Sequence, residues 1–201
     1  SLSFSGTAET ITVSAFSMSL PGGGALSGKG GLSGLTGKTP KISLDGEGKN
    51  IRWSFVESLA DGKKNLGAEG LFDLKWSVKS PLESPAVEFD LRGRDTALSK
   101  TLPLRNISLR GQVSGNDLVL SGGSAELWGG KTGFSGKTSF GASPSIAVKG
   151  TFTGISLKQA ASQLDLEAGK ASGTLSGEFS LSGKARSPVL SLSAKGSPDL
   201  S

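Results

Sequence analysis

Apolar and polar residues alternate along most of this 201-residue chain. A period of two sends successive side chains to opposite faces of a strand, so each strand has one apolar and one polar face. Glycine, serine and Ser-Pro pairs interrupt the runs, as hairpin turns require. The pattern predicts an all-β chain of about fourteen strands forming a long curled antiparallel sheet. Its predicted apolar face comprises Ile42, Leu44, Leu74, Trp76, Val78, Val87, Phe89, Leu91, Ile107, Leu109, Ile146, Val148, Phe152, Phe179, Leu181, Leu190 and Leu192.

Two short segments have helical rather than strand spacing. Ser156 and Gln159 form a capping-box pair, in which each side chain can satisfy an amide of the first helical turn, and they predict a helix over 156–166. Ser54 and Glu57 repeat this arrangement, with Gly62 as the stop of a helix over 54–62. One short helix is therefore expected in each half of the chain.

The two halves of the chain align with each other. Matching positions are Ile51 and Ile155, displaced by 104 (155 − 51), Trp76 and Phe179, displaced by 103 (179 − 76), and Ser84-Pro85 and Ser187-Pro188, displaced by 103 (187 − 84). The alignment predicts repeat 1 over 5–94, a connection over 95–111 and repeat 2 over 112–197. A repeat of this kind is typical of a structure that grows by adding units, here one continuous groove over 1–201. Two tandem globular β domains remain the alternative.

Composition argues against catalysis and cofactor binding. The chain has no His and no Cys, which removes the Ser-His-Asp type of triad and the ordinary ligand sets for zinc, copper and iron. Its 17 acidic residues are scattered, and its net charge of +5 is spread thinly, unlike the clustered charge of nucleic-acid binders. We expect no enzyme, no catalytic residue, no metal, no cofactor and no nucleic-acid partner. A mild attraction to anionic lipid surfaces is compatible with this charge.

The chain does not begin with Met and reads as part of a longer protein. No run within it approaches the roughly 18 consecutive apolar residues of a transmembrane helix. Any membrane association is therefore expected through parts outside this sequence.

The apolar face is expected to be filled incompletely by its own side chains. Aromatic residues make up 6% of the chain, and there are 31 glycines. An apolar trough exposed to water costs about 25 cal/mol per Å². An acyl chain would fill such a trough, because each buried methylene contributes about 0.8 kcal/mol and about 16 carbons would contribute roughly 10 kcal/mol.

The second half of the chain resembles the repeats of AsmA-like proteins and their relative TamB. The resemblance is carried by DLVLSGGSAELWGGKTGFSGKTSF from Asp117 to Phe140, by PSIAVKG from Pro144, by the short helix, and by SGTLSGEFSLSG from Ser172. The first half follows the same order more loosely, with Pro21 in place of the aromatic residue before the Gly-Gly pair. The resemblance implies a periplasmic β-taco, anchored in the inner membrane by other parts of the protein. It also implies phospholipid transport toward the outer membrane, or assembly of outer-membrane proteins with a barrel partner.

Other functions are compatible with parts of the pattern. Ligand-free, adhesin-like β repeats would show the same alternation, and an open sheet edge would bind a partner strand by β-augmentation.

The segment 125–132 satisfies a relaxed phosphate-loop pattern. That mechanism needs a helix after Lys131-Thr132, whereas the pattern there predicts strand and turn. Trp53, Trp76 and Trp128 would serve either as ligand-stacking residues or as core anchors, and core is favoured for Trp76.

Overall fold

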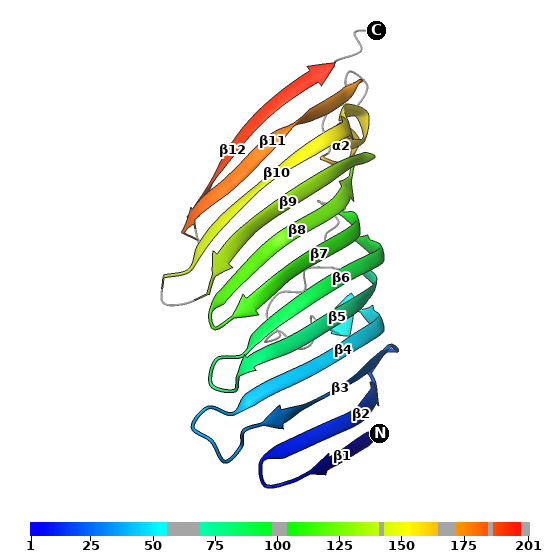
Figure 1. Cartoon of the computed structure of the whole chain (residues 1–201). Coiled ribbons are helices and arrows are strands. Elements are labelled where there is room, and N and C mark those ends of the chain that lie inside the picture. Colours follow the sequence, from blue (N-terminus) through cyan, green and yellow to red (C-terminus); the bar gives the residue numbers. More distant parts are fainter. Residues whose placement is uncertain (56–68, 98–103, 141–142, 165–171, 185–186, 198–201) are drawn as a thin grey trace.

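A computed structural model describes residues 1–55, 69–97, 104–140, 143–164, 172–184 and 187–197. All twelve strands in these ranges belong to one antiparallel sheet whose spatial order follows the sequence (Figure 1). The strands are β1 Leu2–Gly6, β2 Thr10–Ser19, β3 Ala25–Ser33, β4 Lys41–Arg52, β5 Glu69–Pro81, β6 Ala86–Ala97, β7 Arg105–Ser114, β8 Asp117–Leu127, β9 Gly130–Ser139, β10 Ser145–Ser156, β11 Thr174–Lys184 and β12 Ser187–Ser197. The all-β, antiparallel expectation is confirmed.

Strands from both halves of the chain share this single sheet, because β6 pairs with β7 in the middle of the stack. The described residues contain twelve strands, where the pattern suggested about fourteen. The difference arises because the strands are long: β5 has 13 residues and continues through an irregularity in its pairing with β6. The first and last strands lie at opposite ends of the stack (Figure 1).

The sheet curls at the strand ends that carry the helix α2, Leu157–Gln163 (Figure 1). Four register shifts fall at this end, within β4, β5, β7 and β10. Bulges of this kind bend a strand and increase its twist. The large buried side chains gather at the same end, and they include Ile51, Phe72, Ile107, Phe152 and Ile155, each less than 9% exposed. The small core therefore lies along one curled margin of the sheet, which we call the helix-side rim.

The second predicted helix is present as α2. The Ser156 side chain accepts a hydrogen bond of 3.3 Å from the backbone N–H of Gln159, as its predicted capping role requires. Ala161 is the buried residue of this helix. Residues 53–55 are helical, and the remainder of the first predicted helix lies outside the described residues.

Many glycines that read as turn signals lie inside strands, beneath aromatic rings of the neighbouring strand. A Cβ added to Gly46 would lie 2.5 Å from Cε2 of Trp76, and one added to Gly28 would lie 2.6 Å from Cε1 of Phe16. The same relation joins Gly111 to Phe89, Gly123 to Phe134, Gly150 to Phe179 and Gly177 to Phe152. Each ring occupies the space that a side chain on its partner would need. Glycine therefore has a packing role here, which local turn statistics do not reveal.

This relation predicts that Gly150→Ala destabilises the protein. The new Cβ would lie 2.7 Å from two ring carbons of Phe179 and closer still to the carbonyl oxygen of Gly133, and overpacking of this kind costs about 1–3 kcal/mol. Gly122→Ala is the matched control, since a Cβ there meets no atom within 4 Å and should change stability by less than about 0.5 kcal/mol. Urea denaturation measures both, and equal effects would contradict the close packing at Gly150.

Candidate functional site

One row of directly paired residues crosses the entire sheet and contains only apolar residues and glycine. Residues opposite each other in an antiparallel pair lie on the same face. The row runs through Leu2, Phe16, Gly28, Gly46, Trp76, Phe89, Gly111, Leu120, Gly136, Val148, Leu181 and Leu190, one residue from each strand. At about 4.8 Å between strands, this row is about 50 Å long.

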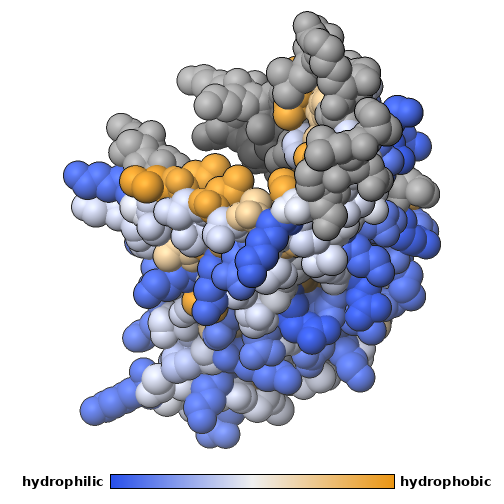
Figure 2. Space-filling view, turned by 90° about the horizontal axis from the view of Figure 1, so that it is seen from above, coloured by the Kyte–Doolittle hydropathy of each residue, from blue (hydrophilic) through white to orange (hydrophobic). Residues whose placement is uncertain are grey.

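All the residues predicted for the apolar face lie on the face of this row, which we call the apolar face. Pairing places them there, for example Leu44 with Val78 and Leu91 with Leu109, and alternation with Leu109 places Ile107. Their exposure varies along the sheet. Ile107 is 2% exposed within the helix-side rim, whereas Leu190 is 64% exposed on the last strand. Figure 2, a view down the stack, shows hydrophobic surface gathered at one margin of the molecule and hydrophilic surface over much of the rest.

The apolar face also contains residues outside the lining predicted from the sequence. Pairing adds Leu2, Phe4, Val13, Phe16, Met18, Leu26, Leu32, Leu118, Leu120, Phe134 and Leu175. Phe16 and Phe134 were hidden because the apolar alternation around them is broken by glycine or by a bulge. A search that counts glycine as an apolar position within strands would have found Phe134.

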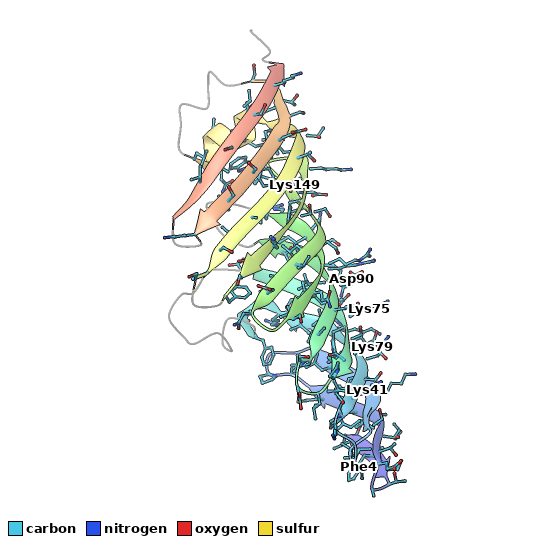
Figure 3. The ribbon with its side chains drawn as sticks, turned by 60° about the vertical axis from the view of Figure 1, so that its left-hand side comes forward. Phe4, Lys41, Lys75, Lys79, Asp90 and Lys149 are labelled. Carbon is cyan, nitrogen blue, oxygen red and sulfur yellow. The ribbon has the colours of Figure 1, made fainter. Side chains whose placement is uncertain are left out.

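The opposite face carries the charged side chains. In Figure 3, the labelled Lys41, Lys75, Lys79, Asp90 and Lys149 project from one side of the sheet. Charges alternate across neighbouring strands, since Glu47 pairs with Lys75, Lys75 with Asp90, and Asp90 with Arg110. Such exposed pairs contribute little to stability individually.

Two electrostatic contacts on this polar face shift a pKa. The hydrogen bond from Arg110 Nη2 to Asp90 Oδ2, 2.9 Å long, lowers the pKa of Asp90 below its ordinary value, and Arg92 acts in the same direction. The pKa of Lys49 is raised by its hydrogen bond to Glu47. Both groups are therefore charged near neutral pH, and neither is poised to exchange a proton there.

Two hollows, of about 1110 and 650 Å³, run along rows of directly paired residues. The larger is lined by Phe16, Trp76 and Phe89 of the apolar row. The smaller is lined by Phe134, Phe179 and Leu192, which lie two positions from that row on the same face. Polar residues on either side of these rows, such as Glu47 and Lys149, complete the linings.

The described residues contain no group of three or more Asp or Glu side chains arranged to hold a metal ion. Among them there is also no helix with the length and hydrophobicity needed to cross a bilayer. The relaxed phosphate-loop segment forms a hairpin, with Lys131-Thr132 in β9 and a turn at Trp128-Gly129. No helix N-terminus follows that lysine, so the amide cradle that binds phosphate is not formed there.

Comparisons with protein-family models, with curated proteins and with solved structures found no match. The chemistry of the molecule therefore has to be inferred from its own surfaces. Its most extensive feature is an apolar face that runs through every described strand and is only half-buried over most of its length. Partly exposed apolar surface of this extent marks a site for an apolar ligand or partner.

Proposed function

We propose that this chain is a non-enzymatic, lipid-handling segment of a periplasmic AsmA/TamB-like protein. Its apolar face forms a β-taco groove that binds or conducts the acyl chains of phospholipids between the inner and outer membranes. Other parts of the protein anchor it in the inner membrane. The lining consists of the apolar-face residues predicted from the sequence, together with Phe16, Leu120 and Phe134.

The observation that supports this proposal is the unbroken apolar row on a face that no second sheet covers within the described residues. A sandwich would bury such a face against another sheet about 10 Å away. Here Trp76, Phe89 and Val148 stay half-buried in the middle of the row. A flexible hydrocarbon chain fits this surface, since it needs continuous apolar contact and no fixed hydrogen-bond pattern.

Two matching bulges support the view that the chain contains two copies of one repeat. In β4, the backbone N–H of Asn50, a residue with a φ of 53°, donates to Asp73 of the next strand at 2.9 Å. In β10, the N–H of Gly154, with a φ of 68°, donates to Ser176 of the next strand at 3.1 Å. These donors are displaced by 104 (154 − 50) and the acceptors by 103 (176 − 73). A groove extended by adding units accounts for such correspondence.

Native mass spectrometry of the purified chain tests the proposal. We expect phospholipid to copurify, and organic extraction followed by addition of phospholipid to restore the bound mass and raise Tm. A chain that carries no lipid, and whose Tm is indifferent to added phospholipid, would instead support ligand-free structural repeats.

The open edges of the sheet favour a second role, as a scaffold that binds strands of outer-membrane proteins by β-augmentation. Phe4 in β1 and Val189 in β12 are 70% and 65% exposed, and the outer edge of each strand has no partner among the described strands. Crosslinkers placed on β1 and β12 should capture a strand of an unfolded barrel protein. Equal capture from sites on β6, in the middle of the sheet, would contradict edge binding.

A further inference from the structure

The two edges of the sheet differ in how well they are protected from a further strand (Figure 1). β1 has five residues, a register shift between Ser3 and Phe4, and an N-terminal ammonium that donates to the Ser17 carbonyl at 2.7 Å. β12 has eleven residues, and all of them pair with β11 without an irregularity. Short or bulged edge strands resist pairing with another chain, whereas a long regular one favours it. β12 is therefore the more open edge.

The composition of β12 also favours a partner strand. Lys195 is the only charged residue in this strand. Leu190 and Leu192 on the apolar face are 64% and 62% exposed, and Val189 on the opposite face is 65% exposed. Charged side chains are one of the devices that keep edge strands from pairing with other chains. β12 instead presents apolar side chains on both faces, and its outer edge has no partner among the described strands.

The smaller hollow reaches this open edge. Its lining includes Ser191, Leu192 and Ser193 of β12, next to Phe179 of β11. No described strand lies beyond β12, so these three residues form the last wall of the hollow on that side. A strand added to β12 would extend the hollow. The hollow and the open edge thus coincide at Leu192.

The sequence of β12 is complementary to a second copy of itself. In an antiparallel pair centred on Leu192, this residue lies opposite its own counterpart, Leu190 lies opposite Ala194, and Ser191 lies opposite Ser193. All eleven residues of the strand then have a partner. Residues of one face meet residues of the same face, as the alternation of strand side chains requires. This register therefore joins the two apolar faces into one.

The same register opposes no like charges. Lys195 falls opposite Val189, about 20 Å along the strand from Lys195 of the second copy. Like charges directly opposite each other would destabilise such a pair, and here they are far apart. Pro188, which lacks a backbone N–H, falls opposite Gly196 near each end of the pair, where its effect on the hydrogen bonds is smallest.

We propose that two copies of this chain pair through β12, antiparallel and centred on Leu192, into one continuous sheet. The contact uses the same surface on both copies, so it closes as a dimer and does not grow into a filament. The smaller hollows of the two copies meet at the two-fold axis. The pairing needs no lipid, and it leaves β1 as the edge that is open to a strand of another protein.

Sedimentation equilibrium of the whole 201-residue chain, without lipid, tests the proposal. We expect a mass of 20.3 kDa in dilute solution and twice that mass at about 100 µM, because an interface of one strand pair is small and dissociates on dilution. A chain that stays monomeric at the higher concentration, or that grows beyond two copies, would overturn the proposal.

Leu192→Lys should weaken dimerisation about tenfold, because it places two ammonium groups opposite each other at the two-fold axis and removes a pair of leucines. Leu2→Lys is the matched control. Leu2 is 64% exposed on the apolar face of the other edge strand, so its replacement should leave the dimer unchanged. A dimer that survives Leu192→Lys, or that Leu2→Lys disrupts, would place the interface elsewhere and overturn the proposal.

The register is tested by oxidation, because the chain contains no cysteine of its own. With copper–phenanthroline in air, Leu192→Cys should form a disulfide-linked dimer. Directly opposed residues have Cα atoms about 4.5–5.5 Å apart, within the range that a disulfide spans. Val189→Cys should stay reduced, since its two copies would lie about 20 Å apart. Equal crosslinking at both positions, or none at either, would contradict the pairing.

The outcomes separate this inference from the proposed function. A monomeric chain that binds phospholipid would overturn the dimer and leave the apolar groove intact. A dimer that binds no phospholipid would support the β12 pairing and overturn the groove.

Discussion

Phe179→Asp is expected to reduce the phospholipid bound by this chain by about 30-fold. The ring of Phe179 lies over Gly150 on the apolar face, and a carboxylate there would keep two or three methylene groups of an acyl chain in water. At about 0.8 kcal/mol for each methylene, the loss is about 2 kcal/mol. Bound lipid is measured by native mass spectrometry or by lipid extraction, with circular dichroism to verify the sheet.

Lys149→Asp is the control for this change, since Lys149 precedes Gly150 on the same strand and lies on the polar face (Figure 3). We expect it to change lipid binding less than twofold. Leu192→Asp provides a second test on the apolar face. Because Leu192 is already 62% exposed, this change should leave the fold intact and still reduce bound lipid. Equal losses for Lys149→Asp and Leu192→Asp would mean that the two faces are wrongly assigned.

Phe72→Ala is expected to cause the largest loss of stability of any single change considered, about 3–5 kcal/mol. Phe72 is 3% exposed and packs with Leu20, Ile51 and the Trp53 ring in the small core at the helix-side rim. The loss is large because the core is small, so a cavity there cannot be filled by neighbouring side chains. Urea denaturation measures the change in the free energy of unfolding.

Phe4→Ala provides the comparison, because it removes the same ring from a site that is 70% exposed in β1. Its expected effect is within about 0.5 kcal/mol. Similar losses at both positions would show that the sheet margin does not act as the core.

The aromatic rings that lie over glycines explain how the apolar face can stay exposed, although no second sheet covers it. Trp76 over Gly46 and Phe16 over Gly28 bring two rings to 6.2 Å from each other, although two strands separate them. Each ring buries part of its surface against the backbone of the neighbouring strand, which reduces the cost of leaving the other part exposed. The resulting surface is broad and shallow, as a flexible hydrocarbon requires.

The sequence alone was sufficient to identify the strands' two faces. Because side chains alternate with a period of two, Leu74, Trp76 and Val78 had to share a side wherever β5 lay. The helix α2 was equally local, since Ser156 caps an amide only three residues away. Composition by itself also limits the chemistry, because a chain without His or Cys lacks the commonest proton-transfer and metal-binding side chains.

Only the tertiary structure decided how these strands come together. Gly46 and Gly150 look like turn residues in the sequence, but pairing with Trp76 and Phe179 places them under rings within long strands. The union of both halves in one sheet depends on pairing between β6 and β7. These features arise from contacts between residues far apart in sequence, and a local pattern carries no information about which strand will lie beside which.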